Sequence, residues 1–364
     1  MPPRDSAAPA PTTDGLRLSA NVSLRQALAQ LDRTGKGIVL VVDTDGRLEG
    51  TITDGDIRRG ILAGLTVAHP VRDLLAGKTA AARPVTAPAG TSSDTLLRLM
   101  REHGVRQVPL LDAAGRVTGL TTLDELLPNV LPDAQAVIMA GGFGTRLRPY
   151  TDDTPKPMLP VGDTPLLERT VRQLRAAGIR RVNISTHYLA EKIVDHFGDG
   201  RDFGVEFTYL REETPLGTAG ALGLMGPLTE RCLVMNGDIL TRVDFRAMLA
   251  YHTEHAAALT VGVRAYEMKV PYGVIEADGP LVRRVVEKPA LQFFVNAGIY
   301  VLEPSAHRLI PADRRFDMTD LITILIAEGH SVVSFPIVEY WLDIGQQPDY
   351  EQAQQDVRTG RYAA

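Results

Sequence analysis

The chain has 364 residues, which is long for a single hydrophobic core and predicts at least two domains. Its composition of 44% hydrophobic and 23% charged residues is typical of a globular protein, and its apolar runs are too short to span a membrane. A net charge of −5 argues against a nucleic-acid partner, while the single cysteine argues against a disulfide framework and favours a cytoplasmic location.

The N-terminal third contains an internal repeat behind a short leader. Residues 1–14 are rich in proline and alanine and lack the apolar stretch of a signal peptide, so we expect a disordered leader. The segment 41–47 recurs as 110–116, and each copy predicts a helix, two strands joined by a tight turn, and a second helix. Because one copy buries too little apolar surface by itself, we expect both to pack as one α+β domain. The expected copies are 15–77 and 84–127.

The repeat resembles a pair of CBS domains, most clearly at 50–58, which reads GTITDGDIR. In that family a threonine and the acidic residue three positions later contact the phosphate and ribose of a bound adenine nucleotide. The resemblance assigns these roles to Thr53 and Asp56, and in the second copy the same positions are Thr122 and Glu125. The chemistry agrees, because a carboxylate can accept hydrogen bonds from both ribose hydroxyls. The pair can instead serve only to dimerise or stiffen the chain, and we expect a homo-oligomer.

The remainder of the chain has the pattern of an α/β domain. Two prolines predict a short, stiff linker over 128–134 ahead of a second domain at 135–364. Strand-like and helical runs then alternate, as in the strand expected at 182–186 and the helix at 189–196. This alternation predicts a doubly wound, mostly parallel, Rossmann-type sheet that binds ligands at the carboxyl ends of its strands. Beyond residue 258 strands outnumber helices, and we expect them to form one wall of the ligand cleft.

A glycine-rich loop opens this second domain. The apolar run 136–140 has the length of a strand and ends in Gly-Gly-Phe-Gly at 141–144, whose amide groups can line a concave phosphate site. Arg146 and Lys156, the latter held between two prolines, would add two cations. The dinucleotide fingerprint lacks its third glycine here, and the P-loop lacks its lysine. The stretch therefore predicts a polyphosphate-binding loop of another type.

The combination of Gly-Gly-x-Gly-Thr-Arg-Leu with the following Pro-Lys-Pro resembles the sugar-1-phosphate nucleotidyltransferases, and the mannose-1-phosphate guanylyltransferase branch looks closest. The resemblance covers about 134–356. It implies that a sugar 1-phosphate attacks the α-phosphorus of a nucleoside triphosphate and releases pyrophosphate. Arg146 and the loop would hold the β- and γ-phosphates, and Lys156 the α-phosphate or the sugar phosphate. The loop residues expected to touch the nucleotide are Ala140, Gly141, Gly142, Gly144 and Thr145.

A loop of small residues follows at 212–220, and in the family it packs against the nucleobase. A carboxylate accepts hydrogen bonds and donates none, so Glu212 matches the N1–H and 2-amino donors of guanine and favours GTP. One alternative is that Glu212 is a solvated loop acid; a separate one is that the enzyme uses CTP, UTP or dTTP. The other nucleotide contacts that the resemblance implies here are Pro215, Gly217 and Thr218.

Two aspartates follow strand-like runs and suggest a magnesium site. Asp238 lies two residues after the run at 232–236, and Asp343 ends a shorter one. Mg²⁺ takes one or two carboxylates together with substrate phosphates, and the family places its metal ligands at these positions. His252 and His255 lie three residues apart, and we expect them on a solvated helix face without a metal.

The resemblance also implies a sugar site. It assigns the sugar phosphate to Lys288, and sugar hydroxyls to Glu287, Asn296 and the amide of Gly273. The attacking phosphate is already largely dianionic at neutral pH, so the reaction requires no general base. The competing hypothesis is a non-catalytic nucleotide sensor. The presence of all five expected charged residues favours the enzyme: Arg146, Lys156, Asp238, Lys288 and Asp343.

Overall fold

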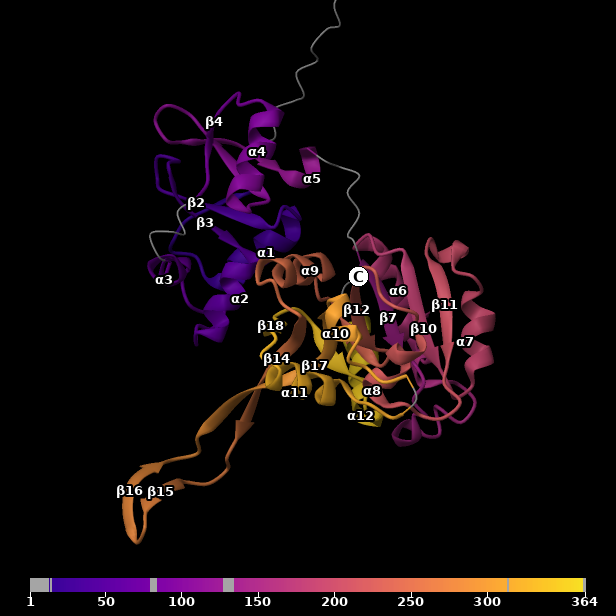
Figure 1. Cartoon of the computed structure of the whole chain (residues 1–364). Helices are drawn as coiled ribbons and strands as arrows, with labels where there is room; N and C mark the ends of the chain where they lie inside the picture. The colour runs from indigo at the N-terminus through magenta and orange to yellow at the C-terminus, as the bar shows by residue number, and fades with distance from the viewer. Residues whose placement is uncertain (1–12, 14, 79–83, 127–133, 313, 363–364) are drawn as a thin grey trace, which may run out of the picture. The chain divides into compact units, whose positions relative to one another are not determined.

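The computed structural model (Figure 1) describes residues 13, 15–78, 84–126, 134–312 and 314–362. The chain divides near residue 130 into two compact units. The expected leader at 1–14 and linker at 128–134 lie almost entirely outside the described residues. Within the described residues, no helix is both long and apolar enough to cross a membrane.

The first unit contains the two expected copies, each built around a three-stranded sheet. In both sheets the first two strands are parallel and the third is antiparallel to the second. Hydrogen bonds from Leu48 to Gly115 and from Val117 to Gly46 connect the turns of the two copies, and a shared apolar cluster lies between the sheets. The elements are β1 (Arg17–Leu18), α1 (Leu24–Thr34), β2 (Ile38–Val42), β3 (Leu48–Thr53), α2 (Asp54–Leu62), α3 (Val71–Ala76), β4 (Ala87–Pro88), α4 (Ser93–His103), β5 (Gln107–Leu111), β6 (Val117–Thr122) and α5 (Leu123–Leu126).

The second unit is organised around a seven-stranded sheet in the order β11-β10-β7-β12-β17-β14-β18. Only β17 runs against the other six strands, so the predicted mostly parallel, doubly wound fold is confirmed. The strands are β7 (Ala134–Met139), β10 (Arg181–Thr186), β11 (Glu206–Arg211), β12 (Arg231–Asn236), β14 (Leu259–Lys269), β17 (Ala290–Leu302) and β18 (Val332–Pro336).

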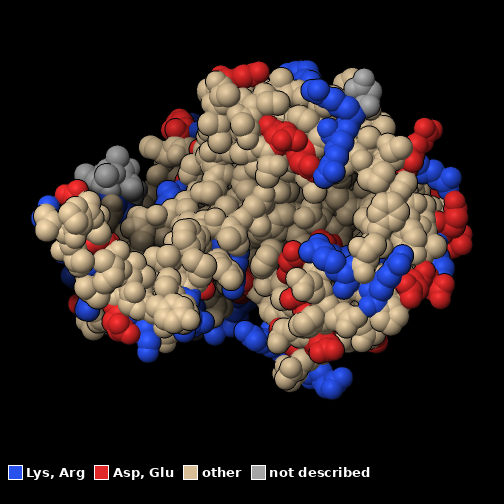
Figure 2. Space-filling view, turned by 90° about the horizontal axis from the view of Figure 1, so that it is seen from below, with Lys and Arg blue, Asp and Glu red and all other residues tan. Residues whose placement is uncertain are grey.

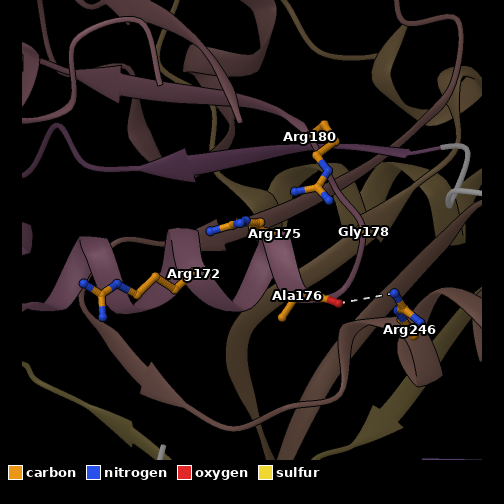
Figure 3. Close-up of a pocket in the computed structure, with 6 residues that line it drawn as sticks. All are labelled: Arg172, Arg175, Ala176, Gly178, Arg180 and Arg246. Atoms are coloured by element: carbon orange, nitrogen blue, oxygen red, sulfur yellow. Dashed lines mark hydrogen bonds between the residues drawn. The ribbon is translucent and has the colours of Figure 1, made fainter. Parts of the chain in front are cut away.

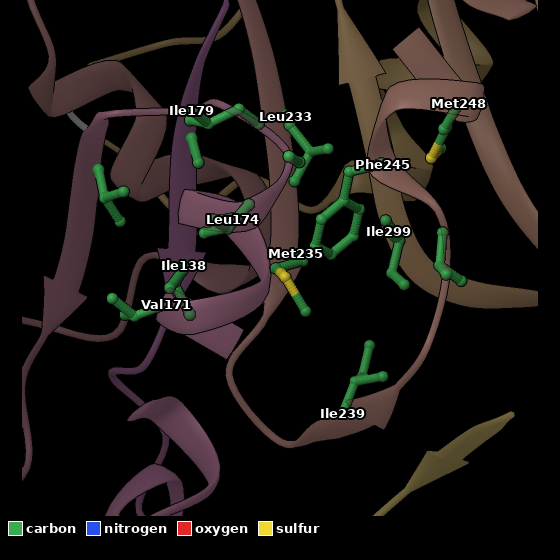
Figure 4. Close-up of a cluster of buried hydrophobic side chains, with 14 of the residues drawn as sticks. Ile138, Val171, Leu174, Ile179, Leu233, Met235, Ile239, Phe245, Met248 and Ile299 are labelled. Carbon is green, nitrogen blue, oxygen red and sulfur yellow. The ribbon is translucent and has the colours of Figure 1, made fainter. Parts of the chain in front are cut away.

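Helices cover both faces of this sheet because successive strand residues alternate between two apolar clusters. Ile138 packs with α6 (Leu166–Ala176), α7 (Ala190–Phe197) and α9 (Phe245–Glu254), whereas its neighbour Val137 packs with the opposite cluster. That second cluster includes residues of α8 (Gly217–Gly220), α10 (Pro304–His307) and α11 (Met318–Ala327). Figure 4 shows Phe245 of α9 beside Met235 of β12 and Ile299 of β17.

The expectation for His252 is wrong. This side chain is fully buried, with Nδ1 2.7 Å from Thr260 Oγ1 and Nε2 3.3 Å from a carboxylate oxygen of Glu303. Burial lowers the pKa of His252 despite the opposing effect of Glu303. The histidine is therefore a hydrogen-bonded core residue.

The strands expected beyond residue 258 are present, and β14 and β17 extend past the edge of the sheet as a long hairpin. β14 and β17 stay paired from Val263 opposite Asn296 out to Lys269 opposite Ala290. Beyond them β15 (Val274–Asp278) and β16 (Leu281–Val286) pair at the tip, which projects away from the sheet (Figure 1). We call residues 266–294 the arm. We expected these strands to form one wall of the ligand cleft, and within one chain the arm projects away from the sheet instead.

Charged side chains are mixed on the surface that Figure 2 shows. Uncharged surface covers the middle of this face, and lysine and arginine lie beside aspartate and glutamate around it. This face therefore presents no single sign of charge.

Candidate active site

The glycine loop follows β7 at the carboxyl end of the strand. The amide of Ala140 donates to the carbonyl of Ser185 at 3.1 Å, which attaches the start of the loop to β10. Gly144 has a φ of 64°, and a Cβ there would lie 3.0 Å from Thr151 Cγ2 and 3.2 Å from Lys156 Cβ. A glycine is therefore required by both conformation and space. Gly142, in contrast, faces open space, and Thr145 begins a short 3-10 helix, Thr145–Leu147, that carries the exposed Arg146.

A small antiparallel sheet brings the two predicted metal ligands together. β13 (Ile239–Thr241) pairs with β19 (Trp341–Asp343), so that Ile239 lies opposite Asp343. The amide of Ile344 donates to the carbonyl of Asp238 at 3.0 Å. The two aspartates, far apart in the sequence, thus flank the same short ladder at the edge of the large sheet where β12 ends.

Lys156 lies between the glycine loop and these carboxylates. Its Nζ is 2.5 Å from Asp238 Oδ2, and its side chain is only 11% exposed. The preceding Pro155 is extended, and residues Lys156–Met158 form one turn of 3-10 helix. Lys156 and the loop are therefore held in one place by backbone geometry and by an ion pair.

The charges in this region interact. The pKa of Asp343 is raised by burial and by the negative charge of Asp238, and Lys156 and Arg146 oppose the shift. The electrostatic effects on Asp343 indicate that four of the five predicted charged residues lie near one another at this sheet edge. Asn236, which ends β12, has a buried Oδ1 without a hydrogen-bond partner among the described residues.

We call the four charged residues Arg146, Lys156, Asp238 and Asp343 the cluster. Its two carboxylates have the donor chemistry of a site for a hard cation. Lys156 pairs with Asp238, and burial together with the negative charge of Asp238 raises the pKa of Asp343, so a cation beside both carboxylates would be stabilised. Among the described residues, there is no group of three or more His, Cys, Asp or Glu side chains that could hold a metal ion. A metal at Asp238 and Asp343 would therefore depend on oxygens of a substrate for its remaining ligands.

Glu212 packs against the glycine loop. Its side chain is buried, with Oε2 2.9 Å from the amide of Leu216, and a Cβ on Gly141 would lie 2.6 Å from its Oε1. The alternative of a solvated loop acid is therefore wrong. Sequence reasoning missed His187, whose Nδ1 lies 2.7 Å from the Glu212 carbonyl and whose ring contacts Phe143. His187 directly follows β10, and polar residues that follow parallel strands gather at this edge.

The other residues of the small-residue loop are held by helix α11. Thr218 donates its amide to Asp317 Oδ1 at 2.8 Å, and its Oγ1 accepts from the amide of Met318 at 2.9 Å. Gly217 has a φ of 85°, and a Cβ there would lie 2.6 Å from Asp317 Oδ1. Pro215 is exposed. The helix begins after the Asp317 cap, and it positions the loop.

The structure separates the predicted sugar residues. Asn296 lies on β17, and its Oδ1 accepts from the amide of Gly298 at 3.0 Å, next to the carbonyl that Trp341 of β19 contacts. Gly273, Glu287 and Lys288 instead lie on the arm. The pairing from Asn296 to Ala290 spans six residues, or about 20 Å of strand. Lys288 is 68% exposed and pairs with Glu287 at 4.0 Å, so this chain does not bring it to the cluster.

The residues predicted to bind a nucleotide in the CBS pair make hydrogen bonds and ion pairs within the fold. Thr53 caps α2, its amide donates to Asp56 Oδ2 at 2.9 Å, and Lys78 Nζ lies 2.6 Å from the same oxygen. Burial raises the pKa of Asp56, but Lys78, the Thr53 amide and Arg59 outweigh it and the pKa is lowered. In the second copy the amide of Thr122 donates to Glu125 Oε2 at 2.9 Å, and Glu125 pairs with Lys36. A nucleotide at either site would compete with these lysines for the acid.

A pocket of about 440 Å³ at the C-terminal end of α6 lies elsewhere. Four arginines line it: Arg172, Arg175, Arg180 and Arg246. Arg180 precedes β10, so the pocket is at the amino end of the parallel strands, opposite the cluster. Arg246 donates to the carbonyls of Ala176 and Ala177, as Figure 3 shows for Ala176. These bonds satisfy carbonyl groups at the C-terminal end of α6.

Comparison with known proteins agrees with both resemblances. A family model described as nucleotidyl transferase matches residues 135–360, and one described as CBS domain matches 10–63 and 71–131. The mannose-1-phosphate guanyltransferase of Pichia angusta is 34% identical over 227 residues, which are 59% of this chain and 62% of the relative. The mannose-1-phosphate guanylyltransferase of Mycobacterium tuberculosis is 32% identical over 234 residues, 62% of this chain and 65% of the relative.

The chain thus spans about three-fifths of the length of these relatives. A solved structure from Bacillus anthracis, assigned as a glucose-1-phosphate thymidylyltransferase and in complex with sucrose, is 27% identical with a TM-score of 0.50. The similarity covers 62% of this chain and 95% of that one. Because the first family model matches more than half of its residues, the chain belongs to the nucleotidyl transferase family.

Proposed function

We propose that the protein is a sugar-1-phosphate guanylyltransferase, which joins GTP and a sugar 1-phosphate into a GDP-sugar and releases pyrophosphate. The observation that carries this proposal is the pairing of β13 with β19, which places Asp238 and Asp343 beside Lys156 and the glycine loop. The names of the guanylyltransferase relatives support GTP, as does the buried carboxylate of Glu212 against Gly141. The catalytic domain would be 135–364, behind a CBS pair at 15–127 and a linker at 128–134.

The chemistry follows from the charges. Mg²⁺ bound by Asp238 and Asp343 would neutralise phosphate oxygens as charge develops in the transition state. The glycine-loop amides and Arg146 would hold the β- and γ-phosphates, and Lys156 would leave Asp238 for the α-phosphate or sugar phosphate. The attacking oxygen is already anionic, so the task of the site is to hold two polyanions in line.

The proposal extends to the other parts of the chain. The CBS pair would act as a nucleotide-sensing or dimerisation module, with an adenine nucleotide at Thr53 and Asp56 once Lys78 is displaced. We propose a cytoplasmic homodimer, since a single cysteine, which is buried, fits a reducing compartment.

The test is pyrophosphate release with Mg²⁺ from GTP, CTP, UTP, dTTP or ATP, each combined with a panel of sugar 1-phosphates that includes mannose 1-phosphate. Release that requires GTP and one sugar 1-phosphate supports the proposal. Release with a pyrimidine nucleotide would remove the role given to Glu212 and keep the reaction. If no combination releases pyrophosphate, also with AMP or ATP added as possible activators of the CBS pair, the remaining hypothesis is the non-catalytic sensor.

A further inference from the structure

The arm concentrates the exposed apolar surface of the protein. Of the fifteen large apolar side chains that are exposed in the described part of the chain, ten lie between residues 266 and 294. They include Tyr272, which is 74% exposed, and Val282 and Val285, which are each 60% exposed. Isolated exposed apolar residues are ordinary, but a set this dense marks a contact surface.

An arm of this kind is not stable by itself. A two-stranded ribbon without a covering layer is marginally stable in water, and both of its edges are open to pairing with another chain. Arg283 pairs with Asp278, and Arg284 pairs with Glu276, so these charges are balanced within the arm. What is left for a partner is apolar surface. Ten side chains that each expose about half of roughly 200 Å² provide about 1,000 Å², comparable with one side of a standard protein interface.

The strand pairing argues against closure of the arm onto its own site. Every residue of β14 from Val263 to Lys269 is paired with β17, without a register shift. Folding the arm back over Asn296 would break this ladder. The paired base directs the arm away from its own sheet, and a second copy of the chain is the occupant that satisfies both arms at once by two-fold symmetry.

We propose that two copies of the chain exchange their arms, each arm packing on the other copy beside Asn296 and delivering Glu287 and Lys288 to the other copy's cluster. The delivery of these two residues rests on the proposed function. The cluster within one chain has two carboxylates, Asp238 and Asp343, opposite Lys156 and Arg146. An additional cation from the partner would suit a site that must hold two polyanions.

The first test measures the contact without measuring activity. The photo-crosslinking residue p-benzoylphenylalanine at position 272, in a mixture of ¹⁵N-labelled and unlabelled full-length chains, should produce covalent dimers whose mixed-isotope crosslinks join the arm to residues of the second unit. The same residue at Leu224, which is exposed outside the arm, is the matched control and should produce few. Crosslinks only within one chain, or no enrichment over the Leu224 control, would overturn the proposal.

The second test asks whether the partner's arm completes the site. Asp238→Asn and Lys288→Ala chains with two different tags are co-expressed, and the mixed dimer is isolated through both tags. Arm exchange leaves one intact site in each mixed dimer, so about half of the wild-type activity should return from two inactive parents. A mixed dimer as inactive as its parents would show that Lys288 acts within its own chain. An inactive wild type would instead contradict the proposed function, and the crosslinks would still decide on the arm.

Discussion

Lys156 Nζ and Asp238 Oδ2 lie 2.5 Å apart, so one ion pair connects the turn after the glycine loop to the end of β12. The lysine is nearly buried, and removal of its partner would leave a cation without compensation. The same aspartate is adjacent to the ladder that carries Asp343. A single carboxylate therefore serves the local fold and, in the proposed function, the metal.

Asp238→Asn separates these two roles. The amide oxygen can still accept a hydrogen bond from Lys156, so we expect the fold to persist and circular dichroism to be unchanged. The loss of an anionic metal ligand should lower kcat by about 100-fold or more in the pyrophosphate assay. Wild-type turnover by this variant in Mg²⁺ would remove Asp238 from the metal site.

Asp343→Asn should increase the stability of the metal-free protein. Burial and Asp238 raise the pKa of Asp343, which means that its ionised form is disfavoured in the folded state. The neutral amide removes this repulsion, so thermal unfolding in EDTA should occur at a higher temperature. Added Mg²⁺ should then raise the melting temperature of the wild type more than that of the variant. A variant that melts below the wild type in EDTA would contradict this account.

Gly144→Ala tests the conformation of the glycine loop. The positive φ and the contacts with Thr151 and Lys156 should reduce stability by about 1–3 kcal/mol, measured by chemical denaturation. Gly142→Ala is the matched control, because a Cβ there meets open space and should leave stability unchanged. Equal losses of stability from the two substitutions would show that the positive φ and the close contacts of Gly144 do not determine the stability of the loop.

Glu212→Gln tests the choice of nucleobase. The glutamine can still accept from the amide of Leu216, but its NH₂ group would meet the donors of guanine. We expect kcat/KM for GTP to fall by about 10- to 100-fold, with little change for pyrimidine nucleotides. Glu213→Gln, at the exposed neighbouring position, is the control and should behave as the wild type. An equal loss of kcat/KM with every nucleotide would indicate that Glu212 supports the loop and does not contact the base.

The pH dependence of the first unit should follow Asp56. Because the pKa of Asp56 is lowered in the folded protein, its ion pairs stabilise the unit above the ordinary pKa of an aspartate, and this stabilisation is lost as the pH falls through the folded value. Asp56→Ala should therefore lower the free energy of unfolding by about 1–2 kcal/mol near pH 7, and the difference should shrink below about pH 4. Hydrogen exchange of the α2 amides, followed against urea concentration at each pH, measures this difference in unfolding free energy. A constant difference across that range would exclude the ionised carboxylate as the source.

Local features of the site were readable from the sequence because short-range sterics decide them. The glycine loop, Arg146 and Lys156 fall within one short stretch, and glycine and proline there restrict the backbone whatever surrounds it. The alternation of strand-like and helical runs, which predicts the parallel sheet, is of the same kind. The positions of Asp238 and Asp343 could be named, but their approach to each other depends on the pairing of β13 with β19.

The sequence by itself thus determined the fold class, the repeat and the phosphate loop, since periodicity and backbone restriction act over a few residues. Only the tertiary structure decided that His252 is buried, that Glu212 supports Gly141, and that Lys288 lies on an arm whose paired strands continue for about 20 Å beyond Asn296. These outcomes depend on long-range register and on which apolar surfaces are covered. Both are properties of the packed chain as a whole, and no short segment carries them.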